Sequence, residues 1–165
     1  MMEKSTQNLN EAFAGESQAN RKYLAFAEKA EKEGYSQVAR LFRAAAAAET
    51  VHAMNHLKAL KAIQATADNL KEAIAGETAE FREMYPGMIA AAQAEGKPEA
   101  LRSFEFANEV EKVHAQLFQK ALANLEHKEA VDIFVCTICG YTVEGEAPDT
   151  CPVCKSLKKF FQKID

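Results

Sequence analysis

The sequence has no long apolar run and no excess of positive charge. No stretch approaches the ~20 consecutive apolar residues of a membrane-spanning helix, so we expect no membrane segment. The net charge is −4, with acidic and basic residues mixed along the chain, which argues against nucleic acid as a partner. Residues 1–13 lack the apolar core of a secretion signal, and this predicts a cytoplasmic protein.

Cysteine and proline are missing from most of the chain. All four cysteines lie within 136–154, so disulfide bonds do not hold the remainder together. Residues 3–127 contain two prolines and are rich in alanine, glutamate, lysine and leucine. Residues 132–165 hold the cysteines, two further prolines and short β-type runs. The change in composition predicts two domains, 1–131 and 132–165.

The larger domain has the apolar periodicity of four amphipathic helices. We expect these helices at about 3–33, 36–65, 69–95 and 98–127. Gly34 and Gly96 are suited to end the first and third helices. Ser36 and Asp68 are suited to cap the second and third, and Pro98 fits the opening turn of the fourth.

The helices form an internal repeat. "AGES" at 14–17 matches "AGET" at 75–78. At an offset of 62 residues, matched positions hold the same residue types: Tyr23 and Tyr85, Gly34 and Gly96, Phe42 and Phe104, Glu49 and Glu111, His52 and His114. Each half therefore places one glutamate and then a Glu-x-x-His motif on a helical stripe, which suggests a pseudo-two-fold axis.

Four glutamates on these stripes call for a positive charge in the interior. They are Glu16, Glu49, Glu77 and Glu111. Burying an unpaired carboxylate costs several kcal/mol, so the four residues would share a core only around cations. Residues three apart lie on one helical face, and helical bundles that hold two iron or manganese ions use this ligand set. A single Glu-x-x-His means little, but the repeated set predicts a two-metal site.

Several further residues have two readings. Glu80 follows Glu77 by one turn and has no equivalent in the first half, so it is either an exposed carboxylate or a seventh ligand. Tyr23 and Tyr85 are either core aromatics or hydrogen-bond donors to the ligand carboxylates. We interpret His56 as a core or hydrogen-bonding histidine and not as a ligand.

The cysteines form two Cys-x-x-Cys knuckles. They are Cys136, Cys139, Cys151 and Cys154. Two such loops can present four thiolates tetrahedrally, as iron or zinc requires. The spacing alone leaves open whether the metal is structural zinc or an electron-carrying iron.

The flanking residues favour iron by resemblance. "CTICGY" and "CPVCK" are similar to rubredoxin, including Gly140 and Tyr141 after the first knuckle and Pro152 in the second. The whole chain resembles the rubrerythrin family, in which a ferritin-like di-iron domain precedes a rubredoxin-like domain. The expected fold is mainly α: a four-helix ferritin-like bundle and a small β-rich rubredoxin-like domain.

The resemblance implies a function and a ligand set. The di-iron ligands would be Glu16, Glu49, His52, Glu77, Glu80, Glu111 and His114. The implied activity is reduction of hydrogen peroxide to water, with electrons arriving from an external reductase or rubredoxin through the rubredoxin-like iron. One iron would exchange His52 for Glu80 as its oxidation state changes, and the two tyrosines would lie beside the ligands.

Three alternatives belong to other classes. An iron-oxidising storage protein would have no evident use for a rubredoxin-like domain. A pure electron carrier would leave the buried carboxylates unexplained. A di-iron oxygenase would need an apolar substrate pocket. An extra carboxylate at Glu80 crowds an open coordination position and so favours the peroxidase.

The length of the second connection predicts an exchanged homodimer. The resemblance implies that the third helix runs parallel to the second. With the expected helix ends, the link must span about 36 Å along the bundle axis to bring Glu49 and Glu77 to the same height. The segment "ATADN" reaches at most ~14 Å when fully extended. An antiparallel turn would leave the two glutamates about 12 Å out of register. We therefore expect residues 3–65 of one chain to pack against 69–127 of another, forming two composite sites.

Overall fold

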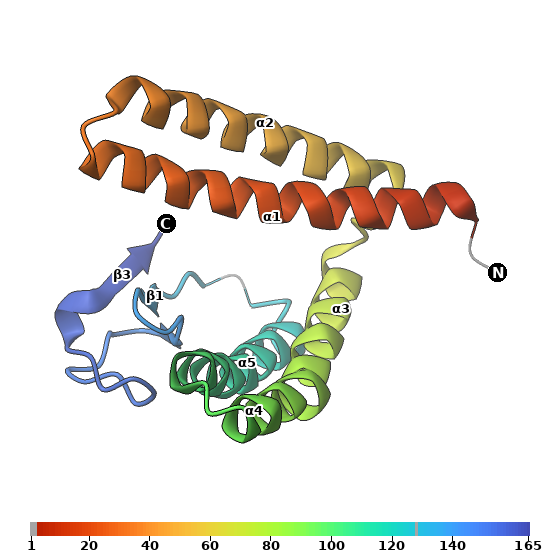
Figure 1. Cartoon of the computed structure of the whole chain (residues 1–165). Coiled ribbons are helices and arrows are strands. Elements are labelled where there is room, and N and C mark those ends of the chain that lie inside the picture. Colours follow the sequence, from red (N-terminus) through yellow and green to blue (C-terminus); the bar gives the residue numbers. More distant parts are fainter. Residues whose placement is uncertain (1–2, 128) are drawn as a thin grey trace. The chain divides into compact units, whose positions relative to one another are not determined.

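The computed structural model describes residues 3–127 and 129–165. It contains two compact units, one ending at Gln64 and one beginning at Ala65 (Figure 1). The first unit is a helical hairpin, and the second combines further helices with a three-stranded sheet. The predicted fold class, four helices followed by a small β-rich module with four cysteines, is confirmed.

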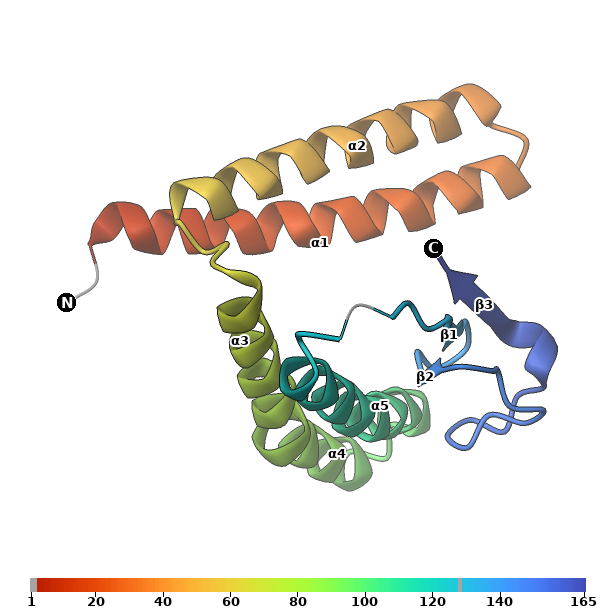
Figure 2. The same cartoon turned by 180° about the vertical axis from the view of Figure 1, so that it is seen from behind.

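Helices α1 (Lys4–Lys32) and α2 (Ser36–Ala59) lie side by side as an antiparallel hairpin in both views (Figures 1 and 2). Gly34 ends α1 with φ 83°, and its N–H donates to the Glu31 carbonyl. The Tyr35 N–H donates to the Ala30 carbonyl, which completes a Schellman turn. Glycine adopts this φ without the clash that a Cβ would cause, so its predicted role is confirmed.

The contact between α1 and α2 is made mainly by small side chains. The buried residues of the hairpin are all alanines: Ala27, Ala30, Ala39, Ala46 and Ala53. Larger apolar side chains stay accessible; Leu41 is 68% exposed and Val51 is 58% exposed. The alanines allow close helix approach, but the hairpin alone buries little apolar surface and so needs a further packing partner.

The third helix consists of three successive segments: α3 (Thr66–Ala79), the π-helical turn η1 (Glu80–Met84) and α4 (Tyr85–Ala94). Helix α5 (Pro98–Ala123) packs against α3 and α4. The ribbon changes direction where α3 leads into α4 (Figures 1 and 2). Gly96, with φ 62°, ends α4, and Pro98 opens α5 as predicted.

The π-helical turn accounts for an irregularity in the internal repeat. Glu16 and Glu77 are 61 residues apart, whereas Tyr23 and Tyr85 are 62 apart. One residue is therefore inserted between Glu77 and Tyr85, and η1 lies in that interval. A π-bulge absorbs one extra residue without ending a helix, so Tyr85 regains the position that Tyr23 has in the first half.

Some predicted helix ends are wrong. Helix α2 ends at Ala59 and not near residue 65, because Lys61 adopts a left-handed φ of 54° and the Ala62 N–H donates to the Leu57 carbonyl. This is the Schellman geometry again, with lysine where glycine is usual. Helix α3 begins at Thr66 and not at residue 69, and α5 ends at Ala123 and not near 127.

Two predicted helix caps are also wrong. Ser36 is the first residue of α2, and Tyr35 occupies the N-cap position. Asp68 lies within the first turn of α3, and Ala65 is the N-cap. Asp68 therefore acts on the positive end of the helix as a charge and not as a capping acceptor.

The cysteine module is a small antiparallel sheet. Strands β1 (Ile133–Cys136), β2 (Thr142–Glu144) and β3 (Phe161–Ile164) have the order β2-β1-β3, with a short 3₁₀ turn, η2 (Lys158–Phe160), before β3. Tyr141 and Phe161 stack edge to face, with ring centroids 6.3 Å apart. None of the helices in the described ranges combines the length and the apolar character that crossing a membrane requires.

Candidate functional site

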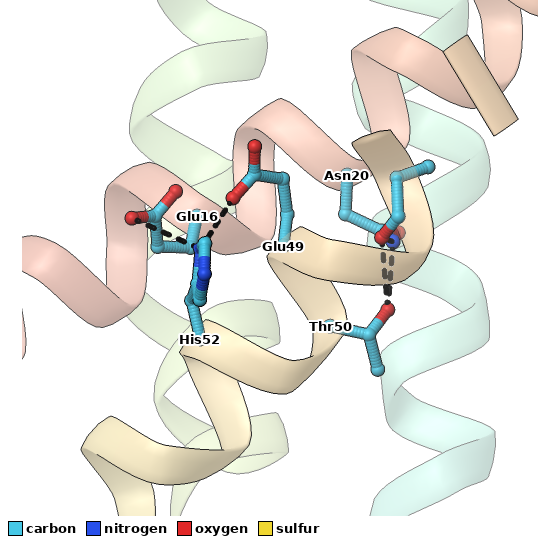
Figure 3. A network of polar contacts seen from close by, with 6 residues as sticks. Glu16, Asn20, Glu49, Thr50 and His52 are labelled. Carbon is cyan, nitrogen blue, oxygen red and sulfur yellow. Dashed lines mark hydrogen bonds and ion pairs between the residues drawn. The ribbon is translucent and has the colours of Figure 1, made fainter. Parts of the chain in front are cut away.

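The first hairpin brings together Glu16 from α1 and Glu49 and His52 from α2. One ligand atom from each residue lies within 4.8 Å of the other two. His52 Nδ1 is 2.8 Å from Glu49 Oε2 and 4.0 Å from Glu16 Oε1, so the ring faces both carboxylates (Figure 3). The His52 side chain is 53% exposed, which leaves its other edge accessible within this unit.

Asn20 fixes the spacing of α1 and α2 beside this cluster. Its Nδ2 donates to the Ala46 carbonyl at 2.7 Å and to Thr50 Oγ1 at 2.9 Å (Figure 3). Asn20 lies one turn after Glu16, and Thr50 follows Glu49 directly. The sequence places Asn20 on the stripe, but no local pattern indicates its partners, because they lie on another helix.

The second unit repeats the cluster with Glu77 from α3 and Glu111 and His114 from α5. Their ligand atoms also lie within 4.8 Å of one another. His114 Nδ1 is 2.8 Å from Glu111 Oε2 and 3.7 Å from Glu77 Oε2. The internal repeat in sequence is thus also a repeat in side-chain geometry.

The carboxylates of the second cluster repel one another. The pKa of Glu77 is raised from 4.5 to about 7, first by burial and then by its hydrogen bond to Glu111 and the charge of Glu111. The ring of His114 opposes the shift. A divalent cation among these oxygens would reverse the balance, because its charge favours the ionised carboxylates.

Glu80 begins the π-helical turn next to this cluster, and Tyr85 directly follows that turn. Burial, and then the charge of Glu77, raise the pKa of Glu80, while the charge of His114 lowers it, so the side chain lies near both groups. Burial and the charges of nearby carboxylates, first Glu111, also raise the pKa of Tyr85. The phenol therefore keeps its proton and is available as a hydrogen-bond donor.

The two tyrosines occupy equivalent positions. The ring centroid of Tyr85 is 6.3 Å from that of Phe104, and the centroid of Tyr23 is 6.1 Å from that of Phe42. The predicted equivalence of Tyr23 and Tyr85 is therefore found in the packing. His56 is half-buried and belongs to neither cluster among the residues that the structure describes.

The four cysteine sulfurs converge. Cys136 Sγ is 3.7 Å from Cys154 Sγ, and Cys139 Sγ is 3.6 Å from Cys151 Sγ. Sulfurs about 2.3 Å from one tetrahedral ion would lie about 3.8 Å apart, so the cluster has the size of a metal site. Cys136 and Cys151 are buried.

Ser156 lies between two of these sulfurs. Its Oγ is 3.2 Å from Cys136 Sγ and 3.1 Å from Cys154 Sγ. Burial alone would raise the pKa of Cys154, but hydrogen bonds from the hydroxyl and the backbone of Ser156 and from neighbouring thiols bring it down to about 6. A thiolate, the form that binds metal, is thereby favoured at this position.

The cysteine module contacts α5 beside His114. Thr142 Oγ1 on β2 is 3.0 Å from His114 Nε2, and Lys120 forms an ion pair with Glu144. Thr142 is not among the predicted site residues, because its contact joins residues that are 28 positions apart. No motif in either segment indicates the contact.

The described residues thus contain two Glu-Glu-His clusters and one four-cysteine cluster. The family model described as Rubrerythrin matches residues 7–122, and the model described as the rubrerythrin rubredoxin-like domain matches residues 134–162. The chain belongs to the rubrerythrin family. The predicted family resemblance is therefore confirmed.

Individual relatives match over nearly the full chain. Rubrerythrin-2 of Clostridium acetobutylicum is 37% identical, and the match covers 93% of this chain and 93% of that protein. Nigerythrin of Nitratidesulfovibrio vulgaris is 35% identical, with 94% and 84% covered. A solved structure, the partially reduced state of nigerythrin, is 33% identical with a TM-score of 0.61, covering 99% of this chain and 88% of that chain.

The donor sets of this rubrerythrin fit the metals of its family, a di-iron site in the helical part and one iron in the four-cysteine site. Carboxylate and imidazole groups suit iron in the helical part, and four thiolates at tetrahedral spacing suit the module. The raised pKa of Glu77 is consistent with this fit, because burial and the neighbouring Glu111 disfavour its ionised form and a bound cation would favour it.

The metal-free bundle should lose stability as the pH rises from about 4.5 to about 7, the range between the ordinary and the raised pKa of Glu77. In that range the folded state retains a proton that the unfolded chain releases, so rising pH favours unfolding. Glu77→Gln should flatten this part of the curve. Urea denaturation of chelator-treated protein at a series of pH values measures it.

Glu109→Gln is the matched control, since it removes the same charge from an exposed residue that pairs with Lys112. It should keep the slope of the parent protein. A Glu77→Gln curve parallel to that of the parent would show that the repulsion within the cluster does not act on stability.

Proposed function

We propose that this rubrerythrin is a peroxidase that reduces hydrogen peroxide to water, with electrons relayed through the iron of the cysteine module. The hydrogen bond between His114 and Thr142 carries the proposal. It connects an electron-carrying module to a candidate ligand of the two-iron site, which a storage protein would not need. Rubrerythrins are oxidoreductases as a family; the peroxidase activity is our inference for this chain.

The chemistry consumes one peroxide, two electrons and two protons and yields two water molecules. The proposed ligands would hold two irons, which in their reduced state would supply both electrons; these ligands are Glu16, Glu49, His52, Glu77, Glu80, Glu111 and His114. The thiolates of Cys136, Cys139, Cys151 and Cys154 hold the iron that accepts single electrons from an external donor. Tyr85, whose pKa is raised, holds its phenolic proton beside the carboxylates and can donate a hydrogen bond there.

Glu80 is the proposed ligand that distinguishes the two halves. A carboxylate favours the harder ferric ion, and a neutral imidazole suits the ferrous ion. His52 is half exposed within its unit, so its ring is free to leave one position. We propose that Glu80 replaces His52 on one iron upon oxidation, and that Tyr23 and Tyr85 orient the carboxylates.

The chain division and the assembly are also proposals. We divide the chain at 131/132, between the two family matches, 7–122 and 134–162. With the observed helix ends, a single chain cannot place α2 and α3 parallel with Glu49 and Glu77 at one level. The rise along α2 from Glu49 to its end is about 15 Å, and the rise along α3 from its start to Glu77 is about 16 Å. In the parallel arrangement the link must span both lengths. The link from Ala59 to Thr66 covers at most about 25 Å of the required 31 Å.

The same helix ends change the antiparallel case. Glu49 and Glu77 now lie at nearly equal distances from the link, so the predicted 12 Å mismatch of an antiparallel turn is wrong. The exchanged dimer therefore depends on the parallel direction that the family resemblance implies. We propose that α1 and α2 of one chain complete the site with α3 to α5 of a second copy.

The reduced protein should react with peroxide far faster than with dioxygen, because Glu80 crowds the position that dioxygen activation would use. Anaerobic stopped-flow mixing with each oxidant measures the two rates. Faster reaction with dioxygen would select the oxygenase.

Cys154→Ser should still consume one equivalent of peroxide per reduced site. Its multiple turnover from an external donor should fall at least about tenfold, because losing a direct metal ligand should cost no less than losing a group that supports a ligand.

Glu80→Ala should leave both irons bound in the reduced protein, since His52 ligates there, and should slow peroxide turnover about tenfold or more. It should also change the absorption spectrum of the oxidised site. Glu83→Ala alters an exposed carboxylate of the same π-helical turn and should behave as the parent does. Parent-like turnover and spectrum in Glu80→Ala would refute the exchange.

Two inactive variants should complement each other if the site is composite. Refolding Glu49→Ala together with Glu111→Ala gives heterodimers in which one site carries both lesions and the other carries neither. Random pairing should restore about one quarter of the parent activity. Glu49→Ala mixed with Glu16→Ala is the control, because each site then keeps one lesion. No recovery in the first mixture would show that single chains build complete sites.

A further inference from the structure

His114 and His52 are equivalent by the internal repeat but differ in their surroundings. Both rings direct Nδ1 towards two carboxylates, at 2.8 Å from the nearer one. The His114 side chain is 26% exposed, and its Nε2 lies 3.0 Å from Thr142 Oγ1. Within the described ranges, Nε2 of His52 meets no such partner, and its side chain is 53% exposed.

The protons around Thr142 determine the direction of this hydrogen bond. Thr142 Oγ1 also lies 3.0 Å from the carbonyl oxygen of Gly140, which can only accept. The hydroxyl has one proton and donates it to that carbonyl. Towards His114 the oxygen can therefore only accept, so Nε2 of His114 carries a proton.

In the neutral form of the ring, which is the form that binds metal, this assignment leaves the lone pair on Nδ1. That lone pair points towards the oxygens of Glu111 and Glu77. Three electron-rich groups directed at one point repel each other unless a cation lies among them. The tautomer that Thr142 selects is thus the one that completes a metal site.

We propose that Thr142 is a positioning residue for the di-iron site: its hydroxyl holds His114 in the tautomer and orientation that bind metal through Nδ1. The inference rests on the proposed function, because it takes His114 as an iron ligand. It makes the cysteine module a structural support of the helical metal site, in addition to its part in electron transfer.

The position of Thr142 depends on the module being folded and docked. Thr142 pairs with Val135 in the sheet, and β1 ends at Cys136 of the first knuckle. A Cβ at Gly140 would lie 3.7 Å from Val110 of α5, so the loop approaches the helix closely. Binding of metal by the thiolates therefore helps to place the hydroxyl that orients His114.

A cavity of about 440 Å³ adjoins the hydrogen bond. It is lined by both partners, His114 and Thr142, and by apolar side chains such as Leu117 and Phe118. The space is large enough to hold water. If the hydroxyl were removed, water would take its place as acceptor and would exchange the Nε2 proton. Proton exchange is therefore a more direct measure of the role of Thr142 than activity.

The two histidines acquire different roles from this difference. His114 is held from both sides of its ring, by the carboxylates and by the hydroxyl. Among the described residues of its own unit, His52 is held on one side only, by the carboxylates. The hydrogen bond of His114 to Thr142 thus gives a physical reason why His114 would stay on its metal.

The test compares Thr142→Val, which keeps the shape and removes the hydroxyl, with Thr142→Ser, which keeps the hydroxyl. The holoprotein is loaded with zinc at all three positions, because zinc is diamagnetic. Proton–nitrogen correlation spectra then report which ring nitrogen of each histidine is protonated and how fast its proton exchanges with water. Thr137→Val, which removes a hydroxyl bonded to the Phe160 carbonyl in the same module, is the matched control.

The parent, Thr142→Ser and Thr137→Val should show a slowly exchanging proton on His114 Nε2. In Thr142→Val this exchange should become about fivefold faster, the effect of one lost hydrogen bond. The signals of His52 should not change. Competition with a chelator should show about tenfold weaker binding of one zinc ion in the helical site of Thr142→Val only.

Unchanged exchange and unchanged zinc affinity in Thr142→Val would overturn the inference. An equal effect in Thr137→Val would overturn it too, because folding of the module and not the hydroxyl would then be responsible. Failure of the assumption that His114 binds metal has a different signature. In that case Nδ1 of His114 would show no shift on zinc loading in any variant, while exchange would still depend on Thr142. Failure of the peroxidase activity would appear only in the reaction with peroxide.

Discussion

Repulsion between carboxylates is the constraint on which the rest of this structure depends. Each helical unit places two glutamates and one histidine within 4.8 Å, and in the second unit burial, together with the neighbouring Glu111 carboxylate, raises the pKa of Glu77 to about 7. Such a core is unfavourable until cations enter it, so metal binding and correct packing of the helices stabilise the same state. The contact between α1 and α2 buries only alanines. These small side chains contribute little apolar burial, so bound metals would supply a larger share of the stability of the folded helices.

Repulsion between negatively charged ligand groups also applies to the cysteine module, which contacts the helical part. Four thiolates also repel one another without a cation, so metal binding would favour the folded module, in which β2 contacts α5. Thr142 then meets His114, and one hydroxyl connects the two metal-binding regions. Membership of the rubrerythrin family explains why both regions occur in one chain. The contact shows how the folding of one region affects the chemistry of the other.

The two Glu-Glu-His clusters were predictable because the spacing of their residues is local. Glu49 and His52 lie one helical turn apart, and Glu-x-x-His recurs at Glu111 at the same offset as the surrounding repeat. The end of α2 was not predictable from glycine, because a lysine takes the left-handed turn there. The π-helical turn did leave a signal, the change in repeat offset from 61 to 62, but only a residue-by-residue comparison of the halves reveals it. The bond between His114 and Thr142 left none, since it joins distant segments.

The single residue inserted at η1 has a consequence for the history of the fold. Two identical halves would build a site in which both metals have the same surroundings, and neither would be preferred as the place where the coordination changes. One additional residue in the third helix is enough to remove this equivalence, because the π-helical turn gives one half a carboxylate at Glu80 that the other half lacks. One insertion can thus make the two halves of a duplicated hairpin inequivalent at the place where their acidic side chains meet.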